Sequence, residues 1–425
     1  MLDIQFIREH RERVADAVVK KRIDLDVQHL LELDDLRRSL VTQRDNLLAE
    51  RNRLAIDEAR TRGPVLKAEL ADLEPKLAVA QAEFDELMLK VPQLPSPDAP
   101  VGGEELNREI KRVGEPTRFD FPHKDHIALG TALDLLDLEQ GAKVSGFRGY
   151  YLKNEAVLLH YGLMQLALEG MRDRGFTLMV PPTKVKEAAL IGSGQFPAAR
   201  AETYQVGNAA RLSGESEKEA EYLVGTAEPS LLAYHADQTL RAVQLPVKLC
   251  GISPCYRSEI GSYGKDSRGL YRIHEFLKVE QVVLCAADDA EQQRCFDELL
   301  GVAEQLLSDL ELPYRVLDLA TGDMGPGKVR QYDIETWMPS RNGYGETHSC
   351  SMLGDWQARR LGIRYVDGAG EKQYVYTLNN TVVASPRILI ALLENYQQAD
   401  GSVRVPALLQ RFVGRDVLIP RISTH

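Results

Sequence analysis

The chain has few cysteines, no long apolar run and no apolar leader. Its five cysteines are an odd number in no disulfide framework, which favours a reducing compartment. No stretch approaches the roughly 20 apolar residues that a membrane-spanning helix needs. The first 26 residues are charged throughout, unlike a signal peptide. These absences argue against a secreted or membrane protein, and we expect a cytoplasmic one.

Positive charge is also in short supply. The 52 lysines and arginines face 63 acidic residues, so the net charge is −11. Nonspecific affinity for nucleic acid comes from cationic surface, and this balance therefore argues against it. Local arginine clusters can still bind RNA on an acidic protein. The position of the basic residues matters more than their number.

A chain of 425 residues is too long for one ordinary core, so two domains are expected. Residues 27–91 predict two long antiparallel helices that fold back at Gly63-Pro64, and Pro75 should kink or locally unwind the second near Glu74. Apolar residues recur in steps of four and three in the second helix, which predicts a coiled-coil seam. The seam consists of Leu66, Leu70, Leu73, Leu77, Ala80, Phe84, Leu87 and Val91.

The first helix has a thinner seam, since only every seventh position from Leu33 to Leu54 is apolar. Such a seam suits a protruding arm, about 45 Å long for about 30 residues per helix. Arg37, Arg44 and Arg51 also fall seven apart. Taken alone, this pattern favours a solvated flank that pairs with its own acids.

The proline-rich segment VPQLPSPDAPVGG, residues 91–103, predicts a stiff linker at the end of the arm domain. We therefore expect domains at 1–103 and 104–425. Short β-rich runs alternate with helices and glycine turns in the second domain, which indicates an α+β fold around an antiparallel sheet flanked by helices. Residues 154–173 predict an amphipathic helix, followed by a strand at TLMV.

The most informative stretch is Cys255 to Gln281, CYRSEIGSYGKDSRGLYRIHEFLKVEQ. Two runs with the strand period of two flank a glycine-rich loop carrying Lys265 and Arg268, which predicts a long antiparallel hairpin with a mobile basic tip. One face of these runs carries Arg257, Glu259, Arg272, His274, Phe276, Lys278 and Glu280. Guanidiniums suit a polyphosphate, an aromatic ring suits a base, and a carboxylate suits an ammonium group. The simpler alternative is the wet face of an antiparallel sheet.

In order and spacing this stretch resembles motif 2 of class II aminoacyl-tRNA synthetases, and the resemblance to seryl-tRNA synthetases covers almost the entire chain. The helix at 154–173 with its strand and Pro181-Pro182 resembles motif 1, which implies a homodimer interface. TLNNTVVASPRILIALLEN resembles motif 3. The family then implies an amino-terminal coiled-coil arm and a class II catalytic domain.

The resemblance also implies a role for particular residues. Arg257, Arg272 and Arg387 would be the catalytic arginines, because fixed guanidiniums stabilise charge that builds on phosphate oxygens without proton transfer. The implied ATP contacts are Arg257, Ser258, Glu259, Arg272, Ile273, His274, Glu275, Phe276, Glu346, Thr347, His348, Ser349 and Arg387. The implied L-serine contacts are Thr226, Ala227, Glu228, Arg257, Glu280, Asn379 and Thr381.

Glu346 and Ser349 would hold Mg²⁺, which prefers hard oxygen ligands. The family implies ATP-dependent serylation of tRNA(Ser) through seryl-adenylate, and of tRNA(Sec) where the host has one. The implied tRNA contacts are Arg37, Arg44, Arg51, Lys265 and Arg268. His348 departs from the serine of many bacterial relatives, and Asn380-Thr381 from a common Gly-Ser.

Four other interpretations fit parts of the sequence. A ligase that loads a carrier protein would lack the heptads of the arm, and a coiled-coil scaffold would lack the charged site residues. A zinc site from His348, Cys350, Cys250 and Cys255 lacks paired CxxC spacing. Residues 322–328, GDMGPGK, fit a phosphate-loop pattern, but Val329 replaces the Mg²⁺-binding hydroxyl, so a glycine-rich surface turn is the better prediction.

Overall fold

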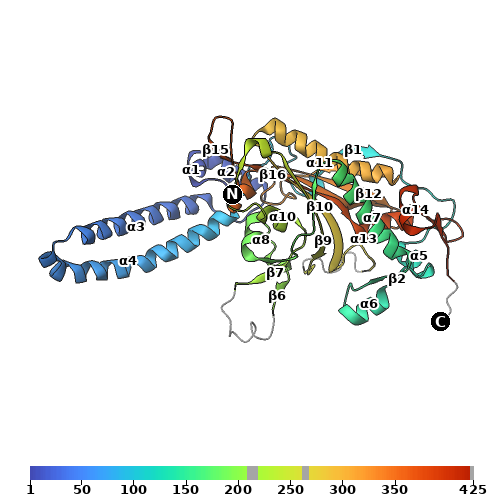
Figure 1. Cartoon of the computed structure of the whole chain (residues 1–425), viewed down its shortest axis with the longest axis horizontal. Helices are drawn as coiled ribbons and strands as arrows, with labels where there is room; N and C mark the ends of the chain where they lie inside the picture. The colour runs from blue at the N-terminus through green and yellow to red at the C-terminus, as the bar shows by residue number, and fades with distance from the viewer. Residues whose placement is uncertain (208–218, 261–267, 422–425) are drawn as a thin grey trace. The chain divides into compact units, whose positions relative to one another are not determined.

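The computed structural model describes residues 1–207, 219–260 and 268–421. Two compact units make up the chain, Met1–Leu94 and Pro95–His425 (Figure 1). No helix among the described residues combines the length and apolar character needed to cross a membrane.

The first unit is entirely helical, and its long helices form the predicted antiparallel pair. Its elements are α1 (Ile4–Glu9), α2 (Arg11–Lys20), α3 (Val27–Arg53) and α4 (Ile56–Lys90). Leu33 and Leu40 of α3 are buried with Leu73, Ala80 and Phe84 of α4, as the heptads predicted. Residues of α1 and α2 join this same cluster, so the start of the chain packs around the base of the arm.

The predicted turn at Gly63-Pro64 is wrong, because the chain reverses at Leu54 and Ala55. Both residues have extended backbones, and the carboxylate of Glu58 accepts a hydrogen bond from the Ala55 N–H at 3.2 Å. Asp57 and Glu58 lie in the first turn of α4, where the helix dipole favours negative charge. Asp57 and Glu58 therefore stabilise a helix that begins at Ile56, before Pro64.

Both prolines consequently lie inside α4, which continues unbroken through Pro64 and Pro75. The local unwinding expected near Glu74 is not found. Arg62 pairs with Glu50 on α3 at 2.6 Å and with Glu69 on α4 at 3.0 Å. Packing against α3 and ion pairs of this kind compensate for the helix hydrogen bond that each proline removes.

The second unit is built on an eight-stranded sheet, which confirms the predicted α+β class. All neighbouring strands are antiparallel except β4 and β9, which are parallel. The order is β1 (Arg108–Val113), β11 (Tyr314–Asp318), β12 (Arg330–Met338), β13 (Gly343–Gly354), β16 (Tyr376–Ala384), β10 (Glu275–Cys285), β9 (Val247–Tyr256) and β4 (Thr177–Met179).

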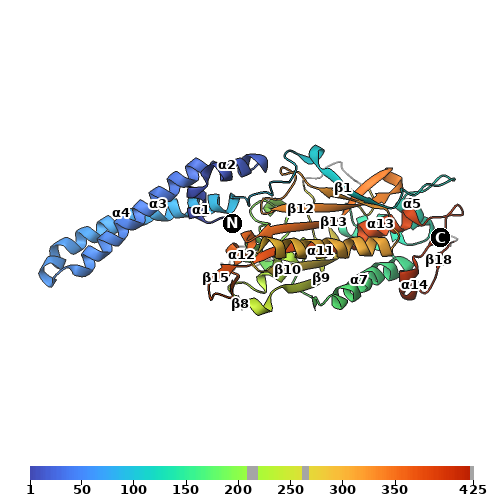
Figure 2. The same cartoon turned by 90° about the horizontal axis from the view of Figure 1, so that it is seen from above.

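The two faces of this sheet pack against different helices. Val279 and Val283 of β10 join a cluster with α11 (Asp289–Asp309), while Val282 and Leu284 join one with α10 (Glu228–Ala233) and α12 (Trp356–Leu361). Successive strand residues point to opposite faces, so alternation along β10 separates the two clusters. In Figure 2, α11 runs along the strands of the sheet.

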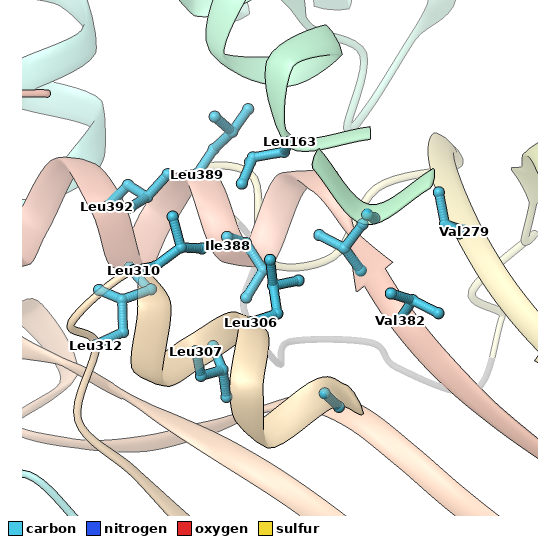
Figure 3. Packing of buried hydrophobic residues seen from close by; sticks show 14 of the residues in the cluster. Leu163, Val279, Leu306, Leu307, Leu310, Leu312, Val382, Ile388, Leu389 and Leu392 are labelled. Carbon is cyan, nitrogen blue, oxygen red and sulfur yellow. The ribbon is translucent and has the colours of Figure 1, made fainter. Parts of the chain in front are cut away.

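The largest core lies where α7 (Glu155–Asp173), α11 and α13 (Ser385–Asn395) meet the sheet. Figure 3 shows Leu163 of α7 facing Leu389 and Ile388 of α13, with Leu306 and Leu307 of α11 below them. The observed α7 and β4 agree with the helix and strand predicted at 154–173 and TLMV. This core fixes the position of α13, whose first turn carries Arg387.

Short elements complete the second unit. The remaining helices in the described part of the chain are α5 (His126–Ala132), α6 (Leu138–Ser145), α8 (Glu187–Ser193) and α14 (Ala407–Val413). The 3-10 helices there are η1 (Glu104–Leu106), η2 (Arg200–Glu202), η3 (Ala242–Gln244) and η4 (Pro339–Arg341). One three-stranded sheet has the order β5 (Lys184–Lys186), β7 (Glu221–Leu223) and β6 (Gln205–Val206), and another has the order β15 (Lys372–Tyr374), β14 (Arg364–Val366) and β8 (Thr239–Arg241). Two further sheets have two strands each: β17 (Val403–Arg404) with β18 (Val417–Leu418), and β2 (Leu136–Asp137) with β3 (Tyr151–Leu152).

Leu163→Ala should lower the free energy of unfolding by about 2–5 kcal/mol, because the side chain is fully buried and its removal leaves a cavity. Val243→Ala is the matched control, since Val243 is 84% exposed and should change stability by less than about 0.5 kcal/mol. Urea unfolding of the full chain measures both. Equal effects of the two substitutions would contradict the assignment of this core.

Candidate active site

A pocket lies where the predicted hairpin meets β13, β16 and the start of α13. Strands β9 and β10 form the stem of the hairpin, with Glu280 opposite Gly251 and Phe276 opposite Cys255. Regular pairing ends at Tyr256 and Glu275, so the predicted strands are too long. Arg257, Glu259, Arg272 and His274 lie beyond the strand ends, and the first three of these line the pocket. The predicted residues in its wall are Arg257, Glu259, Arg272, Ile273, Phe276, Glu346, Thr347, His348, Ser349, Thr381 and Arg387.

Arg257 and Phe276 lie together on one wall. The Arg257 guanidinium carbon is 5.3 Å from the centre of the Phe276 ring, and the Arg257 N–H donates to the His274 carbonyl at 2.9 Å. A flat cation against an aromatic face leaves the opposite face of the ring available for a planar group. The arrangement suits a base and a phosphate that belong to one nucleotide.

Arg272 and Glu259 form an ion pair on the neighbouring wall, with Nη1 2.7 Å from Oε2. Glu259 has a positive φ of 55°, which is uncommon for a residue with a side chain and turns its carboxylate toward the pocket. The ion pair keeps both side chains extended into the pocket. A phosphate group of a ligand can pair with Arg272, and an amino group of the ligand can pair with Glu259, so that each replaces one member of the ion pair.

Arg387 reaches the pocket from the first turn of α13. Its Nη1 donates to the Glu346 carboxylate at 3.0 Å and to the Glu346 carbonyl at 2.7 Å, and its Nε donates to the Tyr271 carbonyl at 3.2 Å. Burial alone would raise the pKa of Glu346, but Arg387, followed by Arg257 and Arg272, lowers it. Glu346 therefore stays a carboxylate amid three arginines.

Glu280 and Thr381 are cross-strand neighbours beneath these arginines. The Thr381 hydroxyl donates to the Glu280 carboxylate at 3.4 Å, and Lys278 lies 2.5 Å from the same carboxylate oxygen. Glu280 is 3% exposed and Lys278 is 5% exposed. In this structure the cation facing Glu280 is Lys278, which lines the pocket and whose role was not predicted; binding of the serine ammonium group by Glu280 stays a prediction.

Glu228 lies in a second, deeper layer. Its Oε1 accepts hydrogen bonds from Asn379 at 2.6 Å and from Gln357 at 2.7 Å. Gln357 is fixed in turn by the Thr377 hydroxyl at 2.7 Å and by the Ser193 carbonyl at 2.8 Å. Burial raises the pKa of Glu228. Gln357 was not predicted, and nothing in its local sequence distinguishes it from an ordinary helix residue.

In the element Thr226-Ala227-Glu228, the two residues before Glu228 have structural contacts. The Thr226 hydroxyl accepts from the Glu228 N–H at 3.4 Å, but the N-cap position of α10 is occupied by Ala227, which provides no side-chain cap. Ala227 is buried in the cluster under α10, and a Cβ placed on Gly251 would lie 3.0 Å from its methyl group. Ala227 packs the element against β9.

Three of the predicted ATP contacts lie outside the wall of the pocket. The Ser258 hydroxyl donates to the Glu202 carbonyl at 2.8 Å, and His274 Nδ1 lies 2.9 Å from the Arg257 carbonyl. Glu275 is exposed, and its carbonyl accepts from Tyr150 at 3.0 Å. These residues shape the end of the hairpin, and their contact with a nucleotide stays a prediction.

Ser349, one of the two predicted metal ligands, accepts from Gln331 at 2.9 Å. Gln331 also donates to Asp333 at 3.0 Å, and Asp333 lies opposite Ser349 across β12 and β13. Burial and the nearby Glu346 raise the pKa of Asp333 to about 7. Within the described ranges no cluster of three or more His, Cys, Asp or Glu side chains could hold a metal. Glu346 and Ser349 supply two oxygen donors, which fits Mg²⁺ only if ligand oxygens complete its shell.

The basic residues predicted to contact tRNA have unequal surroundings. Arg37 contacts Asp34 at 2.8 Å and lies over the Phe84 ring at 4.7 Å, so it stabilises the arm. Arg44 pairs only with its exposed neighbour Asp45, and Arg51 is exposed. Arg268 borders a second cavity beside Tyr271. Lys265 lies outside the described residues.

Two alternatives from the sequence can now be decided. The zinc site is wrong, because His348 is buried between Thr347 at 2.8 Å and the Val382 carbonyl at 3.1 Å, and burial lowers its pKa to about 4. The GDMGPGK segment leads into strand β12 where a phosphate loop would lead into a helix. It is not a simple surface turn either, since Gly327 is buried and a Cβ there would lie 2.5 Å from Trp356.

The antiparallel sheet, the hairpin with its paired arginines, and the arginine at the start of α13 define a class II aminoacyl-tRNA synthetase. Residues 211–396 match the family described as tRNA synthetase class II core domain (G, H, P, S and T). Residues 1–95 match the seryl-tRNA synthetase N-terminal domain.

The particular family follows from whole-chain comparisons. The chain is 44% identical to the serine–tRNA ligase of Deinococcus radiodurans and 40% identical to that of Treponema denticola, in both cases over 98% of this chain and 99% of the relative. A crystal structure of seryl-tRNA synthetase from Pyrococcus horikoshii complexed with ATP superposes with a TM-score of 0.83 at 34% identity, covering 99% of this chain and 100% of the other. This chain belongs to the seryl-tRNA synthetase family.

Asp333→Asn should change how stability depends on pH. The folded protein holds the Asp333 proton more tightly than the unfolded chain, so this group makes stability fall as pH rises from its usual pKa of 3.8 to about 7. The variant lacks this titration. Its stability relative to the original protein should therefore increase with pH across that window and then level off. Urea unfolding at several pH values, without magnesium or nucleotide, measures the difference, and parallel curves would contradict it.

Proposed function

We propose that this protein is an ATP-dependent serine–tRNA ligase. In the first step the serine carboxylate attacks the α-phosphorus of ATP, forming seryl-adenylate and releasing pyrophosphate. In the second step the 3′-terminal hydroxyl of tRNA(Ser) attacks the seryl carbonyl, and AMP leaves. The same acceptor chemistry extends the proposal to tRNA(Sec) where the host has one.

One observation supports the proposal: three arginines that suit phosphate line a pocket next to a carboxylate that suits an ammonium group. Arg257, Arg272 and Arg387 lie in the wall, and Thr381 lies in the same wall directly beside Glu280. Guanidiniums that are held before the reaction stabilise the charge that develops on the α-phosphate oxygens. The serine carboxylate is already a nucleophile at neutral pH, so this step needs no general base.

The residues suit serine because its three polar groups find different partners. The ammonium group would bind Glu280 in exchange for Lys278, the hydroxyl would bind Thr381, and the carboxylate would meet Arg257. Glu228 and Asn379, joined at 2.6 Å, support this part of the pocket from below. Mg²⁺, held by Glu346, Ser349 and phosphate oxygens, would supply further positive charge opposite the arginines.

A homodimer is part of the proposal. Large apolar side chains are exposed on α7 and beside β4, with Tyr161 60% and Val180 84% exposed. Leu158 and Leu178 are also exposed on these elements. An apolar surface of this kind is typical of a subunit interface, and it belongs to the segment that resembles motif 1.

We further propose that residues 1–103 bind tRNA through the arm and that residues 104–425 catalyse both steps, in the cytoplasm. Arg44 and Arg51 are the best candidates on the arm, because Arg37 is occupied by Asp34 and Phe84. Lys265 and Arg268, which lie between β9 and β10 in the sequence, would meet the acceptor stem in the second step.

The primary test is ATP–pyrophosphate exchange with each amino acid in turn. Serine should support exchange, and Glu280→Ala should raise the KM for serine by about a hundredfold while changing the KM for ATP less than about threefold, since only the ammonium partner is lost. Glu280→Gln keeps the shape without the charge and should show most of the same defect. Exchange with threonine or alanine but not serine would refute the substrate, and equal losses for both ligands would refute the role of Glu280.

The arm is tested by Arg44→Ala combined with Arg51→Ala. Loss of two phosphate contacts should lower kcat/KM for charging of tRNA(Ser) by roughly tenfold and leave serine-dependent exchange unchanged. Lys76→Ala is the control on the other helix, because Lys76 is 60% exposed and pairs only with Asp72. Charging that is unaffected in the double variant would contradict the proposed contacts.

A further inference from the structure

A buried histidine behind the pocket connects the returning end of the motif 2 loop to α13. His126, at the start of α5, is 8% exposed. Its Nδ1 lies 2.8 Å from Oε1 of Glu394, and its backbone N–H donates to the same oxygen at 3.0 Å. Its Nε2 accepts from the Leu270 N–H at 3.2 Å.

The charge on Glu394 determines which nitrogen of His126 carries the proton. Burial alone would raise the pKa of Glu394, but hydrogen bonds from His126 and Ser340 outweigh it and lower that pKa. A carboxylate accepts only, so Nδ1 of His126 must donate to it. Nε2 then carries no proton, and its lone pair accepts the hydrogen bond from the Leu270 N–H. Both contacts are satisfied by one arrangement of the ring.

Leu270 and Tyr271, where the chain returns from the loop, are both attached to α13. Leu270 is attached through His126 and Glu394, and Tyr271 through Arg387. Glu394 and Arg387 are seven residues apart on α13, which is two turns, or roughly 10 Å along the axis. Arg387 donates to the Tyr271 carbonyl at 3.2 Å, and its guanidinium lies 4.4 Å from the centre of the Tyr271 ring. Leu270 and Tyr271 are therefore attached to α13 by consecutive contacts, immediately before Arg272.

The backbone at Gly269 is adapted to the imidazole. Its φ is +81°, and a Cβ at this position would lie 2.2 Å from Nε2 of His126. A side chain here would displace either the ring or the loop, so the close approach of loop and histidine requires glycine.

We propose that His126 is a positioning residue for the nucleotide. By holding the Leu270 N–H, it fixes Tyr271 and Arg272 in the pocket wall and keeps Arg387 against them. The loss of His126 should weaken ATP binding and leave serine binding unchanged, because the Glu280 carboxylate is held by Thr381 and Lys278. The identity of the nucleotide rests on the proposed function.

Two substitutions separate the two nitrogens. His126→Asn places an amide donor near the position of Nδ1, so the Glu394 contact is kept and the Leu270 acceptor is lost. His126→Gln places an amide oxygen near the position of Nε2, so the Leu270 contact is kept. Calorimetric titration with MgATP gives the Kd for ATP, serine-dependent exchange gives the KM for serine, and thermal unfolding compares the stability of both variants.

The expected result is a rise of about tenfold in the Kd for ATP in His126→Asn, with the KM for serine within twofold and with His126→Gln close to the original protein. Unchanged ATP affinity in His126→Asn, equal weakening of ATP and serine, or an equal ATP defect in both variants would overturn the proposal. If His126→Asn does not fold, Gly269→Ala displaces the same contact from the loop side, and unchanged ATP affinity there overturns it too. Absence of serine-dependent exchange in the original protein would instead count against the proposed function, because the ATP titration does not depend on serine.

Discussion

The cost of removing charge from water is the constraint on which this pocket depends. An isolated ion moved into a protein interior loses several kcal/mol of hydration, and the loss is recovered only when an opposite charge lies close by. Three ion pairs meet this condition, namely Arg272 with Glu259, Arg387 with Glu346, and Lys278 with Glu280. Each pair keeps a cation and an anion ready in the pocket before any ligand arrives.

The same pairs account for how the pocket can accept highly charged substrates. ATP brings negative phosphates and an adenine amino group, while serine brings an ammonium and a carboxylate. Every group of the ligands can replace one member of an existing pair, so binding exchanges one compensated charge for another and exposes no isolated ion. Asp333 and Glu346 differ from these pairs because both are acidic. The repulsion between their carboxylates contributes to the raised pKa of Asp333.

Strand alternation supplies the geometry that this compensation requires. Lys278 and Glu280 are two residues apart on β10, so they share the pocket face, while Val279 between them is buried in the opposite core. On the far side of the sheet, α13 is packed by α7 and α11 so that Arg387 enters the pocket at a fixed depth. His126 contacts both Leu270, just before Arg272, and Glu394 of this helix. The position of Arg387 in the pocket thus depends on an apolar core formed by uncharged side chains.

Local period and composition were enough to predict the helical pair α3 and α4, the antiparallel pairing of β9 with β10, the helix and strand that resemble motif 1, and residue types suited to phosphate and ammonium groups. It failed at the turn of the arm, where Glu58 and Asp57 start α4 before the conspicuous Gly63-Pro64 pair. The contacts of Gln357, Asp333 and His126 became visible only in three dimensions, because their partners lie between 129 and 268 residues away or on a neighbouring strand. Hydrogen bonds and charge effects between such groups act over a few ångströms in space. The spacing of residues along the chain does not predict which distant residues come that close.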